Sequence, residues 1–147
     1  MFTGEYSHTV DAKGRIVLPA KFREELGEVF YITKGNVADK KMRYVRVFTK
    51  AAWDEYYEKL LKIPESNKVA SKFAKAVFSG TTECSPDKNG RISIPENLRL
   101  YAGIDKEVVS IGGGDKIEIW DKNRWTDYLA DDFDEEELST ALAEFNL

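Results

Sequence analysis

Two short turns carry the residues of this sequence that are best placed to bind a charged ligand. Asp11-Ala12-Lys13-Gly14-Arg15 and Asp87-Lys88-Asn89-Gly90-Arg91 share the pattern Asp-x-x-Gly-Arg. Asp in the first position and Gly in the fourth are typical of a type I β-turn, where the carboxylate accepts backbone N–H groups and the glycine permits a positive φ. Each arginine begins a strand, and Lys13 or Lys88 adds a second cation to its turn. A guanidinium on a rigid turn presents a fork of donors that suits a phosphate or the edge of a guanine.

The same pattern also has a purely structural interpretation, in which an Asp–Arg pair simply closes a hairpin turn. Such short-range ion pairs are common on protein surfaces and individually weak. A fold can also require the same turn twice, so the residues alone leave both interpretations open. If the turns do bind a ligand, we expect Arg15 to lead with Lys13 beside it, because both lie in the basic half of the chain. Arg91 and Lys88 would then act similarly or hold the fold.

An internal repeat explains why the turn occurs twice. When residues 2–23 are placed over residues 78–99, 8 of the 22 aligned positions are identical, whereas chance would give about one or two. We therefore predict two copies of one unit, residues 1–60 and 78–130, joined by a helical connector over 61–77 and followed by an acidic helical tail over 131–147. One unit is too small to bury much apolar surface, so the two copies are expected to pair about a pseudo-two-fold axis and share a core.

Each copy is expected to contain a strand, the turn, a second strand, a short helix and a hairpin. The predicted strands cover 4–9, 15–18, 29–33 and 43–48 in the first copy, and 79–84, 91–94, 107–111 and 116–120 in the second. The predicted helices cover 19–26, 51–62, 67–77, 95–102, 122–130 and 134–144. Pro64 separates the two connector helices, and Trp53, Trp120 and Trp125 are expected to pack in the core or between the copies.

The charge of the chain is unevenly distributed. The 147 residues include 22 Lys and Arg and 26 Asp and Glu, a formal net charge of -4, which alone argues against a nucleic-acid-binding protein. Residues 127–147, however, hold eight acidic residues and no basic one, and the remaining body has 22 basic and 18 acidic residues. The sequence is therefore a mildly basic body with an acidic tail, and its net charge does not exclude DNA.

The composition excludes several other classes of protein. One cysteine, Cys84, excludes an intrachain disulfide framework and a multi-cysteine zinc site. His8 is the single histidine and is expected to have a structural, hydrogen-bonding role, so no nucleophile–base pair or metal site can be assembled. No apolar stretch is long enough to span a bilayer, and no signal peptide is present. These features predict a non-enzymatic, soluble, cytoplasmic protein without a cofactor, metal or small-molecule substrate.

The chain resembles the MraZ family in an ordered series of motifs. The first covers residues 1–23 (MFTGEYSHTVDAKGRIVLPAKFR), the second covers 78–92 (FSGTTECSPDKNGRI), and Ile111-Gly112 and Ile117–Trp120 follow. The resemblance implies an α+β fold, in which two AbrB-like swapped-hairpin repeats form one β-barrel-like pseudo-dimer with flanking helices. Asp11 and Arg15, and Asp87 and Arg91, occupy the two Asp-x-x-x-Arg motifs of the family.

The resemblance also implies a function. Family members are bacterial transcriptional regulators that assemble into homo-oligomeric rings and bind double-stranded DNA at direct repeats upstream of the division and cell-wall gene cluster, including their own gene. For this chain it implies a nucleoid-associated, sequence-specific DNA-binding protein, a repressor, with Arg15, Lys13, Arg91 and Lys88 on DNA. Asp11, Gly14, Asp87 and Gly90 would shape the turns.

One segment departs from the family pattern, and two other functions stay open. Residues 36–49 are longer and more basic than expected, and Lys40, Lys41, Arg43 and Arg46 form either a second phosphate patch or a solvated hairpin. An AbrB-like DNA-binding antitoxin is one alternative function. A ring-forming protein-interaction scaffold, with the acidic tail binding a protein partner, is the other.

Overall fold

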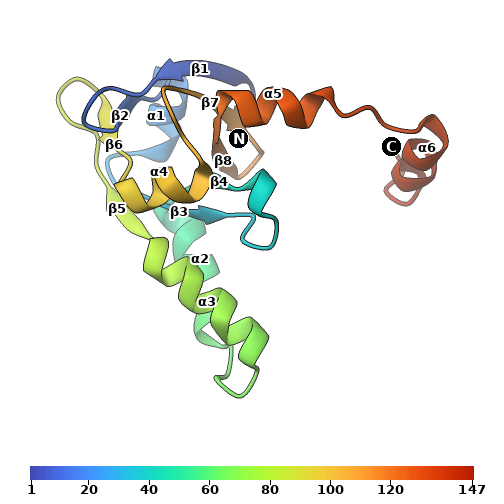
Figure 1. Ribbon diagram of the computed structural model, residues 1–147. Helices are drawn as coiled ribbons and strands as arrows, with labels where there is room; N and C mark the ends of the chain where they lie inside the picture. The colour runs from blue at the N-terminus through green and yellow to red at the C-terminus, as the bar shows by residue number, and fades with distance from the viewer.

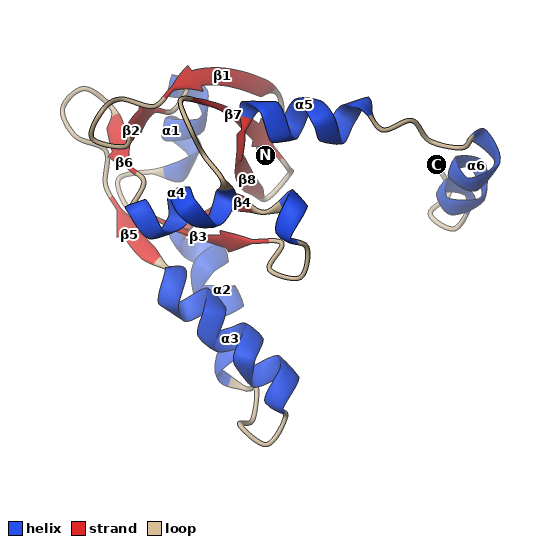
Figure 2. Cartoon of the chain, viewed as in Figure 1, coloured by secondary structure: helices blue, strands red, loops and turns tan.

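The computed structural model describes residues 1–147 as a mixed α+β protein, as predicted (Figures 1 and 2). The first half contains β1 (Glu5–Thr9), β2 (Arg15–Val17), α1 (Ala20–Leu26), β3 (Phe30–Gly35), the 3-10 turn η1 (Lys40–Met42), β4 (Tyr44–Thr49) and α2 (Lys50–Leu61). The second half contains α3 (Lys68–Gly80), β5 (Thr82–Cys84), β6 (Arg91–Ser93), α4 (Glu96–Ala102), β7 (Glu107–Gly112), β8 (Lys116–Asp121), α5 (Lys122–Ala130) and α6 (Glu135–Ala143).

The strand predicted over residues 79–84 begins too early. Ser79 and Gly80 form the last turn of α3, and β5 starts only at Thr82. The helix continues because its buried positions, Ser71, Ala74 and Val77, follow helical spacing up to the edge of the sheet. It ends at Thr81, whose N–H bonds to the Phe78 carbonyl oxygen at 3.2 Å.

The two halves exchange strands. A six-stranded antiparallel sheet has the order β1-β7-β8-β4-β3-β5, so β1 of the first half pairs with the second half's hairpin and β5 of the second half pairs with the first half's hairpin. The predicted β3–β4 and β7–β8 hairpins are confirmed, and they meet where β4 pairs with β8. β1 and β2 do not pair with each other, so the turn between them does not close a hairpin.

β2 and β6 form a separate two-stranded antiparallel ribbon with Ile16 opposite Ile92 (Figure 1). Both isoleucines are almost completely buried, at 1% and 2% exposure, beneath the ribbon. They belong to one core of 17 buried residues drawn from both halves, as expected for two units that share a core. Its fully buried members include Leu18, Phe22, Phe30, Ile32, Val45, Val47, Ile94, Leu98, Val108, Ile117 and Ile119.

The longer helices lie outside this core. α2 and α3, separated near Pro64 as predicted, form an arm that projects from the body (Figure 1). α3 packs on α2 and β3 through a second cluster around Phe48, Trp53 and Val77. α6 follows an extended segment after α5 and stands away from the body (Figure 2). No helix has both the length and the apolar character needed to cross a membrane.

The amino-terminal residues pack closely against Gly112, the last residue of β7. Phe2 and Gly114 exchange two backbone hydrogen bonds of 2.7 and 2.9 Å, and the Gly112 N–H donates to the Gly4 carbonyl oxygen at 2.9 Å. A Cβ on Gly112 would overlap backbone atoms of Phe2 and Thr3, whereas a Cβ on Gly113 would meet only ordinary contacts from 3.5 Å outward.

We therefore expect Gly112→Ala to lower the free energy of unfolding by about 1–3 kcal/mol, because the clash is with backbone that cannot rotate away. Gly113→Ala is the matched control and should change stability by less than about 0.5 kcal/mol. Urea denaturation of both variants measures the difference. Equal stabilities would show that the amino terminus is not held at this position.

Candidate nucleic-acid interface

The first turn is organised by the carboxylate of Asp11. Its Oδ1 accepts the backbone N–H groups of Lys13 and Arg15, both at 2.9 Å, and its Oδ2 accepts Nε of Arg15 at 2.7 Å. The Gly14 N–H donates to the Asp11 carbonyl oxygen at 3.0 Å, which closes the turn, and Gly14 has the positive φ of 78°. In this geometry Asp11 and Gly14 both contribute directly to the shape of the turn.

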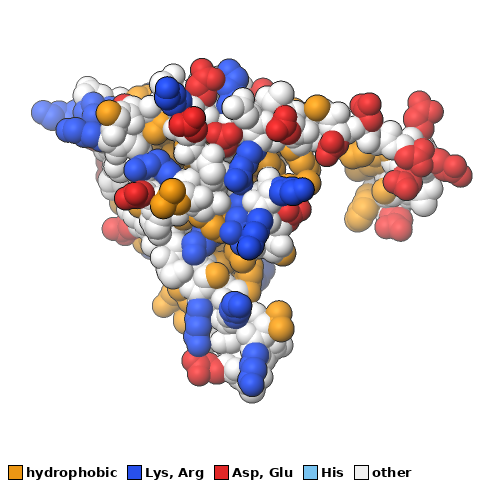
Figure 3. All heavy atoms as spheres, in the orientation of Figure 1, with side chains coloured by type: hydrophobic (Ala, Val, Ile, Leu, Met, Phe, Trp, Pro, Cys, Tyr) orange, Lys and Arg blue, Asp and Glu red, His pale blue; other side chains and the backbone are white.

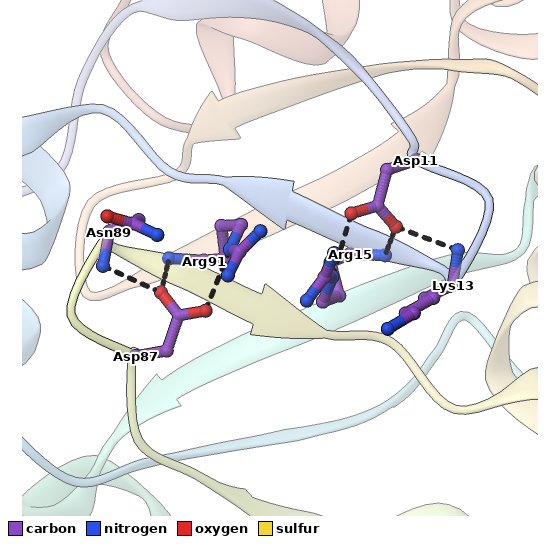
Figure 4. Close-up of polar contacts among 6 residues, drawn as sticks. All are labelled: Asp11, Lys13, Arg15, Asp87, Asn89 and Arg91. Atoms are coloured by element: carbon purple, nitrogen blue, oxygen red, sulfur yellow. Dashed lines mark hydrogen bonds and ion pairs between the residues drawn. The ribbon is translucent and has the colours of Figure 1, made fainter.

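The second turn repeats this arrangement bond for bond (Figure 4). Asp87 accepts the N–H groups of Asn89 and Arg91 at 2.9 Å and Nε of Arg91 at 2.7 Å, and Gly90 has a φ of 75°. In both turns the aspartate engages only Nε and the backbone, so the two terminal nitrogens of Arg15 and Arg91 make no hydrogen bond within the chain. Each guanidinium is thus oriented by its own turn and still has its fork of donors free.

Hydrogen bonding also sets the ionisation of the two turns. The backbone N–H of Arg15, more than its guanidinium, lowers the pKa of Asp11, and the backbone N–H of Arg91 does the same to the pKa of Asp87. Both carboxylates are therefore negative throughout the neutral range and remain paired with their arginines. The exposed fractions of the side chains lie between 27% and 38%, so solvent screens these ion pairs.

The β2–β6 ribbon places both arginines on one face. Arg15 lies opposite Ser93 and Val17 lies opposite Arg91, and because side chains alternate along a strand, these four share the outer face of the ribbon. Ile16 and Ile92 alternate with them and point into the core. Val17 is 44% exposed on this face. The structure thus brings Arg15 and Arg91, 76 residues apart, onto one narrow strip of surface (Figure 4).

Two further arginines, Arg23 and Arg99, lie beside the turns and were not among the residues predicted to form this surface. Arg99 lies over Gly14, and Arg23 lies over Gly90, so each half of the chain covers the turn of the other half. Nε of Arg23 donates to the Leu18 carbonyl oxygen at 3.0 Å, and Arg99 donates to the Ile94 carbonyl oxygen. The repeat in the sequence could have indicated both residues, because Arg23 and Arg99 form one of the eight identical pairs between the two copies.

The lysines of the turns are not equivalent. Lys13 occupies the turn position that Asn89 occupies in the second copy, and Lys88 is the counterpart of Ala12. Both lysines are exposed. The two turns therefore share their arginines and their shape but carry their extra cation at different positions.

The four basic residues expected to act together in the segment over residues 36–49 fall into two pairs with different surroundings. The Arg43 guanidinium lies 4.7 Å from the centre of the Tyr101 ring and donates to the Val37 carbonyl oxygen, and Arg46 lies over Tyr44 and Phe48. These two arginines pack against aromatic rings, and only Lys40 and Lys41 of the predicted patch are exposed.

The two residues with catalytic potential are both in structural positions. Cys84 is buried in β5, and burial raises the pKa of its thiol to about 11, so the thiol is protonated and inert. Burial also lowers the pKa of His8. A backbone hydrogen bond with Val17 partly opposes this effect and fits the structural role expected for His8, whereas its buried Nε2 has no hydrogen-bond partner.

The lowered pKa values predict how the turns respond to acid. A carboxylate whose pKa is lower in the folded state stabilises the fold above its ordinary value of 3.8, and this contribution disappears as the pH falls through the folded-state pKa. The Asp11→Asn/Asp87→Asn variant should therefore be less stable than the wild type at pH 6–7, and the gap should close as the pH falls below about 4. Urea denaturation from pH 7 to pH 3 measures the gap. A constant gap would mean that hydrogen-bond geometry rather than carboxylate charge matters.

The contact of Arg99 with Gly14 can be tested by replacing the glycine with and without the arginine. Gly14 has a φ of 78°, and a Cβ at this position would overlap the Arg99 guanidinium. In the Arg99→Ala background, Gly14→Ala should lose about 1–2 kcal/mol of stability to the positive φ. In the wild type the same replacement should cost about 0.5–1.5 kcal/mol more, because the displaced guanidinium gives up its bond to Ile94. Urea denaturation of the four proteins measures this excess, and equal losses in both backgrounds would contradict the contact.

Comparison with known proteins places this architecture in a family. The model of the MraZ protein family, described as antitoxin-like, matches residues 1–75 and 77–146. A protein of Clostridium tetani named transcriptional regulator MraZ is 44% identical over the full length of both chains. A protein of the same name from Moorella thermoacetica is 43% identical over the full length of both chains. Another, from Caldicellulosiruptor bescii, is 50% identical over 85% of this chain and 84% of the relative. The resemblance seen in the motifs is confirmed, and the chain belongs to the MraZ family.

Proposed function

We propose that the chain is a sequence-specific, DNA-binding transcriptional regulator that reads DNA with the outer face of the β2–β6 ribbon. The observation that carries this proposal is the pair of oriented arginines, Arg15 and Arg91, whose terminal nitrogens are unused on a two-stranded ribbon. The major groove of B-DNA is wide enough to admit a two-stranded β-ribbon. The names of the relatives, which describe transcriptional regulators, agree with this function.

The outer face of the ribbon offers the chemistry for base recognition. Arg15 and Arg91 can each donate two hydrogen bonds to O6 and N7 of a guanine, the commonest specific contact of this kind. Val17 can contact a thymine methyl group, and Ser93 can donate or accept. Because Val17 and Ser93 occupy equivalent positions in the two copies, the two halves of the ribbon would read different bases.

The flanking cations would supply affinity through the DNA backbone. Lys13 and Lys88 are exposed on the two turns, and Arg23 and Arg99 lie over the turn glycines. Figure 3 shows Lys and Arg side chains gathered at the end of the molecule that carries the ribbon, far from the acidic side chains of α6. Contacts to phosphates position a protein and make its binding depend on salt.

A single ribbon would bind DNA with modest affinity, so high affinity would require several ribbons acting together. We propose that copies of the chain assemble into a ring that presents several ribbons to direct repeats in DNA upstream of the division and cell-wall gene cluster, including its own gene, and represses transcription there. Binding to a second repeat then becomes intramolecular and raises affinity without new types of contact. Such a protein would be associated with the nucleoid.

We expect Arg15→Ala to raise the Kd for an upstream fragment with direct repeats roughly tenfold to a hundredfold, about 1–3 kcal/mol, because a bidentate base contact is lost. Arg91→Ala should have an effect of the same kind, and Arg15→Lys should not restore binding, because an ammonium cannot form the bidentate contact. The measurement is fluorescence anisotropy over a salt series, with sedimentation velocity to show that assembly is intact.

Lys62→Ala is the matched control, because this exposed cation lies at the far end of α2. It should leave the Kd unchanged. Wild-type affinity of Arg15→Ala, with intact assembly, would exclude the ribbon as the DNA-reading surface.

An antitoxin is the second candidate function, because the family description is antitoxin-like. It would use the same ribbon on DNA and would in addition bind a small toxic protein. Purification of the tagged chain from its own host distinguishes the two. A stoichiometric small partner whose expression alone arrests growth would favour the antitoxin.

A further inference from the structure

The two halves of the chain differ in how their aromatic clusters are covered. In the first half, Phe48, Trp53 and Tyr56 pack together on α2 and β4, and α3 closes this cluster with Ala74 and Val77. Trp53 is 6% exposed as a result. A helix that follows the hairpin thus completes the first unit.

The equivalent cluster of the second half has no such helix. Trp120, Trp125 and Tyr128 lie 72 residues after Phe48, Trp53 and Tyr56 and also pack against one another in edge-on and tilted arrangements, with ring centres 5.2–5.7 Å apart. α5 has no buried residue, and Tyr128 and Leu129 are 43% and 59% exposed. Beside them lies a surface pocket of about 400 Å³, lined by Lys40, Lys41, Met42, Arg124, Asp127, Tyr128 and Asp131.

α6 has the properties of the missing helix. It follows α5 in the chain as α3 follows α2, and it too has no buried residue. Leu138 and Leu142 lie four residues apart and therefore on one side of α6, and Phe145 follows in the turn just after the helix ends at Ala143. Figure 3 shows apolar side chains on one side of α6 and acidic side chains on the other. The exposed fraction of Phe145 is 70%, so this stripe has no partner within the chain.

We propose that α6 of one copy packs on the α5 face of a second copy, in the place that α3 takes on α2. The backbone is extended at both ends of the link, with φ and ψ of −67° and 115° at Asp131 and −72° and 125° at Asp134, and it directs α6 away from its own α5. The acidic side of α6 is complementary in charge to Lys40, Lys41 and Arg124, which line the pocket. Asp127 and Asp131 line the same pocket and would repel the acidic side chains, so we place these side chains next to Lys40 and Lys41.

This contact joins two different surfaces, the tail of one copy and the α5 face of the next. A heterologous contact of this kind repeats from copy to copy and gives a ring where the rotation closes. The inference therefore rests on the proposed self-association and names the surfaces that produce it. It is independent of DNA binding, so the test is made without DNA.

The first experiment measures association of the full-length chain by sedimentation velocity over a concentration series. Leu142→Asp in α6 and Leu129→Asp in α5 should each weaken association at least tenfold, since each buries a charge in an apolar contact. The double variant should be little worse than either single variant, because both remove the same contact. Val69→Asp is the matched control. Val69 is 84% exposed on α3, and its replacement should have no effect.

The second experiment shows which copy supplies α6. Chains with Leu129→Cys alone are mixed with chains with Leu142→Cys alone and treated with a short bismaleimide crosslinker; Cys84 is buried, and wild-type chains show its background. The mixture should give crosslinked dimers of the two different chains. A chain with both cysteines that crosslinks within itself at high dilution, with no dimers in the mixture, would place α6 on its own α5 and overturn the proposal.

The remaining outcomes separate this contact from the proposed function. If the wild-type chain is monomeric at every concentration, both this contact and the proposed ring are wrong. If the wild type assembles and neither Leu142→Asp nor Leu129→Asp weakens assembly, the contact is wrong and the ring stands on other surfaces. Unchanged thermal unfolding of both variants would show that the body is folded, because neither side chain belongs to a buried cluster.

Discussion

The pairing of β2 with β6 is the interaction on which the rest of the molecule depends. It joins the two copies at their centre, where Ile16 lies opposite Ile92 and both side chains enter a core that neither copy could close alone. β2 and β6 pair with each other and not with their neighbours in sequence, and β1 and β5 each pair with the hairpin of the opposite copy. The same pairing places Arg15 and Arg91 on one outward face.

The Asp–Arg pairs of the Asp-x-x-Gly-Arg turns shape the turns without using up the arginines. The aspartates do close the turns, but they hold the arginines through Nε and leave the other nitrogens free. A solvent-exposed ion pair of this kind adds little to stability. Its more important effect is orientation, since a guanidinium held in one direction loses less conformational freedom when it binds a ligand.

The two copies differ in net charge and in whether a helix covers their aromatic cluster. The first is basic and has its aromatic cluster covered by α3, whereas the second is acidic, and its equivalent cluster on α5 is partly open. The acidic residues that give the chain its net charge of -4 are concentrated in the tail, away from the ribbon (Figure 3). A symmetrical fold thus has two different ends, one with two oriented arginines and one with an unpaired apolar helix.

The sequence by itself determined the repeat, the two turns, the short helices after Pro19 and Pro95 and the two hairpins, because these depend on hydrogen bonds between residues close in the chain. It also identified Asp11 and Arg15, and Asp87 and Arg91, as one recurring unit. Only the tertiary structure decided that β1 pairs with β7 about 100 residues away, since alternation of apolar residues shows that a strand has a buried face but not which strand lies beside it. For the same reason only the fold revealed that Arg23 and Arg99 cross to the opposite turn, and that α3 is packed while α6 is not.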